Sequence, residues 1–285
     1  MELKIAMSLS VCSQIYPDKA KVLSERLQLP LIATMPAQKA LDNTLLLSWY
    51  REKNQTDDTP AKLGLFSAFS GPVSIDFTGG KKQHRRQFGG GKGQPLARAI
   101  GLGSYDAPSV LDATAGMGGD AFVFATLGCQ VTMVERSPIV AALLEDALNR
   151  ARQPVENADN PPEDQELKGI IQRLSLVNAD AADYLLSQKP EVDVIYLDPM
   201  YPEKKKSASA KKEMKVLQHL LGPDLDSERL LDAALHTARL RVVVKRPAKA
   251  PTIAGIQPTA QINSPNTRYD LYSIKALKAS GKLAD

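Results

Sequence analysis

From Gln94 onward, short apolar stretches alternate with helical ones, and this alternation constrains the fold more than any other feature. The apolar stretches lie within "PSVLDATAG", "CQVTMVER", "LSLVNAD", "DVIYLDP" and "LRVVVKRP". Such alternation is typical of βαβ units with a parallel sheet covered by helices on both faces. Two later stretches, "IQPTAQINS" and "RYDLYSIKA", follow each other without a helix and predict a closing hairpin at one sheet edge. We therefore expect a doubly wound α/β domain over residues 95–285.

Residues 1–94 have an irregular pattern. A strand near 3–11, a helix near 18–27 and short stretches such as "TLLLSWY" and "GPVSIDF" predict a small, strand-rich N-terminal α+β domain. Its last segment, "GGKKQHRRQFGGGKGQ" (79–94), has too many glycines and charges for a core element and is interpreted as a basic linker. The polar, proline-rich stretch 153–166 is interpreted as a surface insertion.

The composition, with 43% apolar and 24% charged residues, is that of an ordinary globular protein. No apolar run reaches the roughly 18 residues of a membrane span, and the first residues lack the basic region and cleavage site of an export signal. Cys12 and Cys129 lie in apolar surroundings without metal-ligand spacing. We therefore expect buried free thiols, a cytoplasmic location, and neither a membrane partner nor a metal site.

The stretch "VLDATAGMGGDAFVFATLGCQVTMVER" (110–136) carries a Rossmann-type nucleotide-binding pattern. A strand is followed by turns at Gly116, Gly118 and Gly119, where glycine lets the backbone approach a ligand closely, and a helix begins near Asp120. Glu135 follows at the end of the second strand, where its carboxylate can accept hydrogen bonds from both ribose hydroxyls. The pattern alone does not distinguish NAD from S-adenosylmethionine (SAM).

The charges near the glycine turn favour SAM. Asp120 would place a negative charge beside the pyrophosphate of a dinucleotide, whereas Asp112 and Asp120 would both attract the sulfonium and ammonium of SAM. The alternative is that Asp120 is only a helix cap and Asp112 only a turn former. After the third strand, Asp180 can accept from the adenine amine, or cap the helix that begins near Ala181.

The fourth strand leads into "DPMYP" (198–202) at the edge where open α/β sheets bind ligands. This sequence resembles the D/N-P-P-Y/F motif of methyltransferases that act on exocyclic amines, with Met200 in place of the second proline. Asp198 and the Pro199 carbonyl could accept the amine protons, and Tyr201 could stack on an extruded base. Positioning would then supply most of the acceleration. The alternative is a proline-ordered turn with a packing tyrosine.

Three basic clusters lie at or near the same predicted rim, and a phosphate backbone is a ligand that would use them together. Lysine runs are more often solvated helix faces, and that alternative stays open. The residues that we expect to contact such a polyanion are Arg85, Arg86, Lys204, Lys205, Lys245 and Arg246.

Together with "YLDPMYPEKKKSASAKKEMKVLQ", "LLGPDLD", "RVVVKRP" and "HRRQFGGGKGQPLARAIG", these motifs resemble the RsmJ family of bacterial 16S ribosomal RNA guanine-N2 methyltransferases, over nearly the whole chain. The resemblance implies a Rossmann-like class I SAM-dependent methyltransferase fold and transfer of a methyl group from SAM to the N2 of a guanine. The cofactor contacts expected from the motifs and the resemblance are Asp112, Gly116, Gly119, Asp120, Glu135, Arg136, Asp180, Ala181 and Asp198.

Three alternatives stay open at the level of sequence. An adenine-N6 methyltransferase acting on RNA or DNA would use the same motif, because both targets are exocyclic amines. An NAD-linked oxidoreductase would need a catalytic histidine or lysine, and none is suitably placed. A non-catalytic RNA-binding protein could retain the fold.

Overall fold

The chain forms two sheets in a computed structural model that describes residues 8–41, 44–68, 70–79, 91–104, 106–153, 162–200, 220–221, 226–281 and 283. Among these residues, one sheet has five strands and the other has seven. The described residues divide into two compact units. The first comprises 8–76, 142–150 and 220–221, and the second comprises 77–141, 151–200, 226–281 and 283, apart from the gaps given above.

The first unit is built on a mixed five-stranded sheet with the strand order β2-β1-β3-β4-β5. β1 pairs in parallel with β2 and β3, while β3, β4 and β5 pair in antiparallel fashion. The strand-rich region expected from the sequence is confirmed. Its elements are β1 (Ser8–Cys12), α1 (Pro17–Leu27), β2 (Leu31–Ile32), the 3-10 turn η1 (Gln38–Leu41), β3 (Thr44–Tyr50), β4 (Lys62–Ser67) and β5 (Ser70–Val73).

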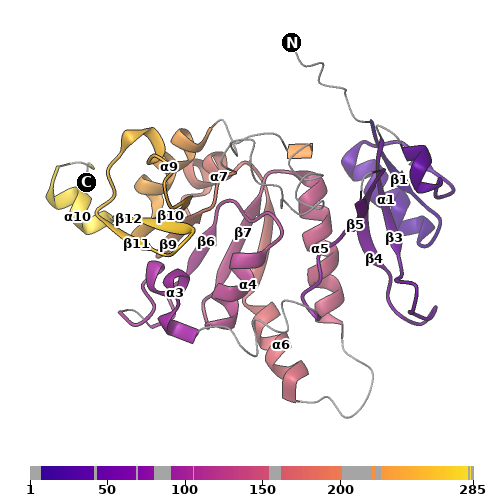
Figure 1. Ribbon diagram of the computed structural model, residues 1–285, viewed down its shortest axis with the longest axis horizontal. Coiled ribbons are helices and arrows are strands. Elements are labelled where there is room, and N and C mark those ends of the chain that lie inside the picture. Colours follow the sequence, from indigo (N-terminus) through magenta and orange to yellow (C-terminus); the bar gives the residue numbers. More distant parts are fainter. Residues whose placement is uncertain are drawn as a thin grey trace. The chain divides into compact units, whose positions relative to one another are not determined.

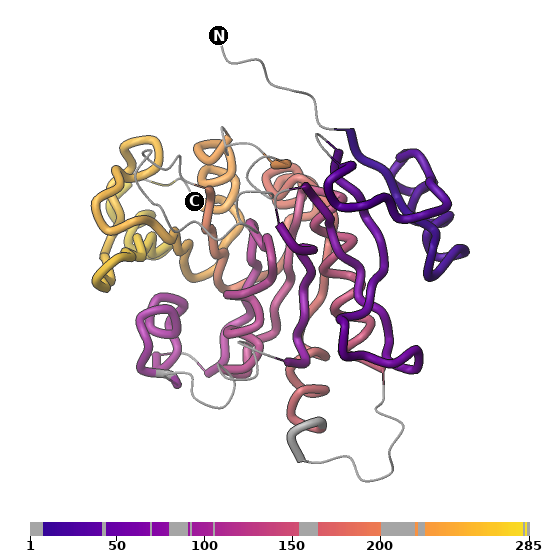
Figure 2. The backbone as a smooth tube through the Cα atoms, turned by 45° about the vertical axis from the view of Figure 1, so that its right-hand side comes forward, coloured from indigo at the N-terminus to yellow at the C-terminus, as the bar shows by residue number. Residues whose placement is uncertain are grey.

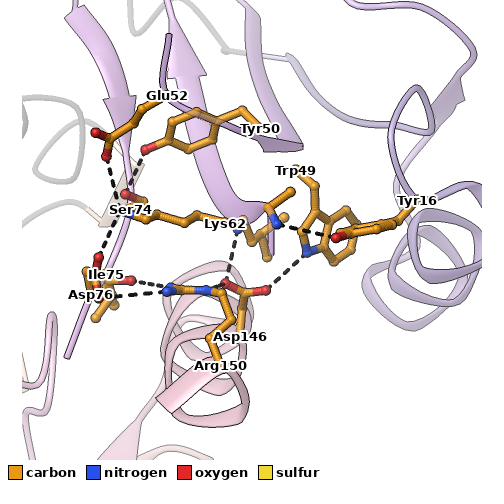
Figure 3. Close-up of polar contacts among 12 residues, drawn as sticks. Tyr16, Trp49, Tyr50, Glu52, Lys62, Ser74, Ile75, Asp76, Asp146 and Arg150 are labelled. Atoms are coloured by element: carbon orange, nitrogen blue, oxygen red, sulfur yellow. Dashed lines mark hydrogen bonds and ion pairs between the residues drawn. The ribbon is translucent and has the colours of Figure 1, made fainter. Parts of the chain in front are cut away.

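Asp146, in helix α5 (Pro138–Arg152), is the polar anchor of this small sheet (Figure 3). Its carboxylate accepts from the Trp49 indole nitrogen at 3.0 Å and from the Leu63 backbone nitrogen at 3.0 Å. It also pairs with Arg150 Nε at 2.8 Å, and Arg150 donates to the Ile75 carbonyl. Trp49 is 7% exposed, so these bonds satisfy groups that water reaches poorly.

The second unit holds the seven-stranded sheet, in the order β11-β12-β10-β9-β6-β7-β8 (Figure 1). The five neighbouring strands β10, β9, β6, β7 and β8 are parallel. β12 is antiparallel to both of its neighbours, β10 and β11. The expected doubly wound sheet and its closing hairpin are therefore confirmed. The strands are β6 (Val110–Asp112), β7 (Val131–Glu135), β8 (Leu174–Asn178), β9 (Val194–Leu197), β10 (Arg241–Pro247), β11 (Ala260–Asn263) and β12 (Thr267–Ser273).

Helices connect these strands, and the hairpin of β11 and β12 lies at the end of the sheet (Figure 2). The helical elements are η2 (Gly91–Gly93), α3 (Pro95–Ala99), α4 (Gly119–Thr126), α6 (Pro162–Gln172), α7 (Ala181–Gln188), α9 (Ser227–Thr237), η3 (Ile253–Gly255) and α10 (Ile274–Ala279). α7 and α9 pack on each other, as do α4 and α6. A buried apolar cluster includes Leu111 of β6 and Ile195 of β9, together with Leu185 of α7 and Leu231 of α9. The four parallel strands that surround the site are thus fixed by apolar packing.

The proposed boundary between residues 94 and 95 stays a prediction, because residues 80–90 lie outside the described part of the chain. The first compact unit ends its N-terminal segment at Asp76 and also includes residues 142–150 of α5. Of the predicted insertion at 153–166, residues 154–161 are not described, and α6 begins at Pro162.

Cys12 and Cys129 are buried free thiols, as expected. No helix within the described residues has the length and apolar character needed to cross a bilayer.

Replacing Asp146 with Ala should lower the free energy of unfolding of the first unit by about 2–4 kcal/mol, because buried donors and Arg150 lose their acceptor. Urea unfolding followed by the fluorescence of Trp49, the single tryptophan of the sequence, measures this change. Glu145→Ala is the control, since the Glu145 pair with Arg26 is about half exposed and should contribute about 0–1 kcal/mol. Equal losses in both variants would contradict the anchoring role.

Candidate active site

The turn between β6 and α4 has a backbone that requires glycine. Gly116 and Gly118 have φ angles of 52° and 65°, in the left-handed region that side chains with a Cβ rarely adopt. A Cβ placed on Gly119 would meet no described atom within 4 Å, so the start of α4 borders open space. A ligand can therefore approach the backbone of this turn closely.

Glu135, at the end of β7, fixes the glycine turn. One carboxylate oxygen accepts from the Gly116 nitrogen at 2.9 Å, and the other accepts from the Ser137 nitrogen at 2.8 Å. The residue is 6% exposed. Because each carboxylate oxygen has a second acceptor position, these bonds are compatible with the predicted role in binding ribose hydroxyls.

Asp180 caps α7, which confirms one of its two predicted roles. Its carboxylate accepts from the Asp183 nitrogen at 3.0 Å and from Arg229 at 2.5 Å. Ala181 is buried as the first residue of α7, and Arg136 pairs with Asp226 at 3.3 Å. Adenine recognition by Asp180 and cofactor contacts by Arg136 and Ala181 stay predictions.

The tip of β9 lies against the glycine turn. The Asp198 backbone nitrogen donates to the Thr114 hydroxyl at 2.6 Å, and the Ala113 nitrogen donates to the Tyr196 carbonyl at 2.9 Å. Both bonds follow from the parallel pairing of β6 with β9, in which Asp112 lies opposite Tyr196. The structure thus brings the two motifs of the sequence to one place.

A single lysine links the acidic side chains of this region. Lys245 Nζ, from β10, lies 2.8 Å from Asp120 Oδ2 and 2.8 Å from Asp198 Oδ2. The Tyr196 hydroxyl donates to the same Asp120 oxygen at 2.7 Å. Asp112 is 2% exposed at the end of β6 and accepts from the Thr114 nitrogen. The cluster therefore draws its residues from β6, α4, β9 with its following turn, and β10.

Burial and mutual charge shift the pKa values of three groups in this cluster. Burial raises the pKa of Asp112 well above its ordinary value, and the charge of Asp120 adds to this. Burial likewise raises the pKa of Tyr196, and the negative charges of Asp120 and Asp198 raise it further. The phenol therefore stays a neutral donor. Burial alone would lower the pKa of Lys245, but the charges of Asp198 and Asp120 outweigh it and raise that pKa. Lys245 is therefore a permanent cation among more numerous carboxylates.

Several predicted site residues lie outside the described part of the chain: Tyr201, Arg85, Arg86, Lys204 and Lys205. Pro199 is described, and is buried directly after Asp198. Lys245 and Arg246 have partners that the sequence did not predict. Lys245 bonds the two aspartates, while Arg246 is 7% exposed and donates to the Pro251 carbonyl at 2.9 Å. The RNA contacts predicted for both residues stay predictions.

Sequence reasoning missed the contributions of Thr114 and Tyr196 and the two aspartate partners of Lys245. The signal for Lys245 was its place inside the apolar strand "RVVVKRP", since a charge in a buried strand needs a partner. Tyr196 gave a weaker signal, as the one residue of "VIYL" with a polar atom to satisfy. Among the described residues, no group of three or more His, Cys, Asp or Glu could hold a metal ion.

Comparison with known proteins agrees with this geometry. Residues 56–274 match the family described as "Putative SAM-dependent methyltransferase". A ribosomal RNA small subunit methyltransferase J from Hydrogenovibrio crunogenus is 59% identical over 94% of this chain and 95% of its own. The protein of the same name from Chromobacterium violaceum is 46% identical over 93% and 95% of the two chains. The chain belongs to the ribosomal RNA small subunit methyltransferase J family.

A solved structure supports the family fold. The crystal structure of a SAM-dependent methyltransferase from Neisseria gonorrhoeae is similar to this chain with a TM-score of 0.66 and 29% identity, covering 93% of this chain and 96% of that one. The expected Rossmann-like methyltransferase fold is confirmed, and the cofactor is SAM. The open space at Gly119 and the excess of carboxylates near Asp120 fit a cationic sulfonium at the glycine turn.

Replacing Glu135 with Gln should weaken cofactor binding about tenfold or more, because an amide cannot accept from both the Gly116 and Ser137 nitrogens as the carboxylate does. Calorimetric titration with S-adenosylhomocysteine measures the change. Glu145→Gln, an exposed acidic residue of α5, is the control and should bind as the unaltered chain does. Unchanged affinity in Glu135→Gln would contradict the role given to this carboxylate.

Proposed function

We propose that this chain transfers a methyl group from SAM to the exocyclic N2 of a specific guanine in small-subunit (16S) ribosomal RNA. The observation that carries the proposal is the contact between Thr114, in the glycine turn, and Asp198, in "DPMYP". It brings the expected cofactor turn and the expected amine-binding motif within one hydrogen bond. The names of the most similar relatives supply the substrate, small-subunit ribosomal RNA.

The residues at this contact have separate proposed roles. Gly116, Gly119 and Asp120 border the cofactor, with Asp112 buried behind them and Glu135 toward its ribose. Asp198 and the Pro199 carbonyl accept the protons of the target amine, and Tyr201 stacks on the extruded base.

When bound, SAM supplies an electrophilic methyl carbon, so that the N–C bond forms as the S–C bond breaks and S-adenosylhomocysteine departs. The guanine amine is a poor nucleophile because its lone pair is delocalised into the ring. Acceptors at Asp198 and Pro199 can orient its nitrogen toward that carbon. After methylation, the cationic nitrogen releases one proton to solvent water. Orientation of the reacting groups, rather than a covalent enzyme intermediate, accounts for the acceleration.

Basic residues of two segments are proposed to contact the RNA. Arg85, Arg86, Lys204 and Lys205 are proposed to bind phosphates, because they belong to basic segments next to the cofactor domain or the amine-binding motif. A ribosomal RNA substrate also implies a cytoplasmic enzyme with the small ribosomal subunit or its RNA as partner. The proposal includes neither a membrane partner nor a metal ion.

Replacing Asp198 with Ala should abolish methyl transfer, because the target amine loses its main acceptor, while affinity for S-adenosylhomocysteine stays within about tenfold. Tritium transfer from labelled SAM to ribosomal RNA from a strain lacking the enzyme measures activity, and calorimetry measures binding. The control is Asp232→Asn, an exposed aspartate on α9. Unchanged turnover in Asp198→Ala would refute the assignment.

The methylated nucleoside separates the proposed function from its nearest alternative. Digestion of the methylated RNA to nucleosides, followed by mass spectrometry, should yield N2-methylguanosine. N6-methyladenosine would instead establish the adenine-N6 reaction, which the same motif permits.

A further inference from the structure

Lys245, a basic residue of the candidate active site, is partly buried and bonded on two sides. Its side chain is 27% exposed, and its ammonium lies 2.8 Å from both Asp120 and Asp198. An ammonium so placed makes two charge-assisted hydrogen bonds, which are shorter and stronger than neutral ones. Such a side chain has a fixed position before any substrate arrives.

We propose that Lys245 is a positioning residue of the methyl-transfer step, which holds the Asp198 carboxylate in the ionised form and in the orientation that receives the target amine. The inference rests on the proposed function, since it assigns a role within that reaction. Asp198 has its backbone held by Thr114 and one carboxylate oxygen held by Lys245. Two independent bonds therefore fix the residue at both its main chain and its side chain.

The groups around Lys245 explain why a cation is needed there. Asp112 from β6, Asp120 from α4, and Asp198 after β9 bring three carboxyl groups near one another, and Tyr196 of β9 adds a buried phenol. Like charges this close disfavour ionisation of one another. The Lys245 ammonium places a positive charge 2.8 Å from both Asp120 and Asp198, and the Tyr196 hydroxyl donates to the same Asp120 oxygen.

The alternative role for Lys245, a contact to an RNA phosphate, conflicts with this geometry. The ammonium would have to leave two aspartates to reach a phosphate, and both carboxylates would then lose their cation. A lysine used for phosphate binding is typically solvated, whereas Lys245 has its charge neutralised within the protein. A positioning role would control kcat, whereas a phosphate contact would control the KM for RNA.

The test compares unaltered enzyme with Lys245→Met in methyl transfer to ribosomal RNA. The variant should lose at least about tenfold in kcat. The acid limb of the plot of kcat against pH should move to higher pH. Asp198 would no longer have beside it the Lys245 ammonium, whose positive charge favours the ionised carboxylate. Lys245→Arg, which keeps the charge, should keep the position of the acid limb. Affinity for S-adenosylhomocysteine, measured by calorimetry, should stay within about threefold in both variants.

Lys249→Met is the matched control, because Lys249 is an exposed lysine just beyond β10. It should keep the kcat and the acid limb of the unaltered enzyme. If Lys245→Met does not fold, as judged by thermal unfolding, Lys245→Gln is measured instead, since the amide keeps hydrogen-bond donors without the charge.

Other outcomes overturn the inference. If Lys245→Met kept its kcat but raised the KM for RNA, with a salt dependence shallower by about 0.7 in log–log slope, Lys245 would be a phosphate contact. Loss of S-adenosylhomocysteine binding would make it a cofactor-site residue. An unaltered enzyme that transfers no methyl group to ribosomal RNA would refute the proposed function itself, whereas an active enzyme with an unchanged Lys245→Met variant would refute only this inference.

Discussion

The parallel pairing of β6 with β9 is the constraint on which the site depends. In the order β9-β6-β7, the chain leaves β6 toward one side of the sheet and later returns to its other side, so the turns after β6 and β9 meet at the reversal of strand order. Open α/β sheets bind ligands at this position. Because Asp112 pairs with Tyr196, the next residues, Thr114 and Asp198, lie within hydrogen-bond distance. A change of register by one residue would separate them.

The strand β10, which pairs in parallel with β9, supplies a positive charge next to the carboxylates at this sheet edge. Its pairing with β9 places Val244 opposite Leu197, so the following residues, Lys245 and Asp198, also lie side by side. Strand register therefore sets an ion pair as well as a hydrogen bond. Adjacent carboxylates at one sheet edge raise the free energy of the folded chain unless a cation lies among them. The lysine makes the acidic site compatible with a stable fold.

The sequence predicted the elements well because their signals are local. Alternation of apolar and helical stretches located the strands of the larger sheet, and the glycines located the turn before α4. The partners that a side chain has in space could not be predicted in the same way. Lys245 was assigned to RNA because a sequence shows its charge and not the two aspartates beside it. Glu135 was assigned to ribose, while its bonds to Gly116 and Ser137 depend on a loop conformation that spacing does not define.

The same limit explains why domain boundaries drawn along the chain differ from compact units in space. Asp146 lies in α5, between two strands of the larger sheet in sequence, yet its carboxylate binds Trp49 and Leu63 of the smaller one. A fragment of residues 1–94 would contain every strand of the smaller sheet but not this acceptor. The indole and amide donors would then have no carboxylate, and their unpaired burial costs about 1–3 kcal/mol each. The N-terminal sheet thus depends on a helix that its own segment does not encode.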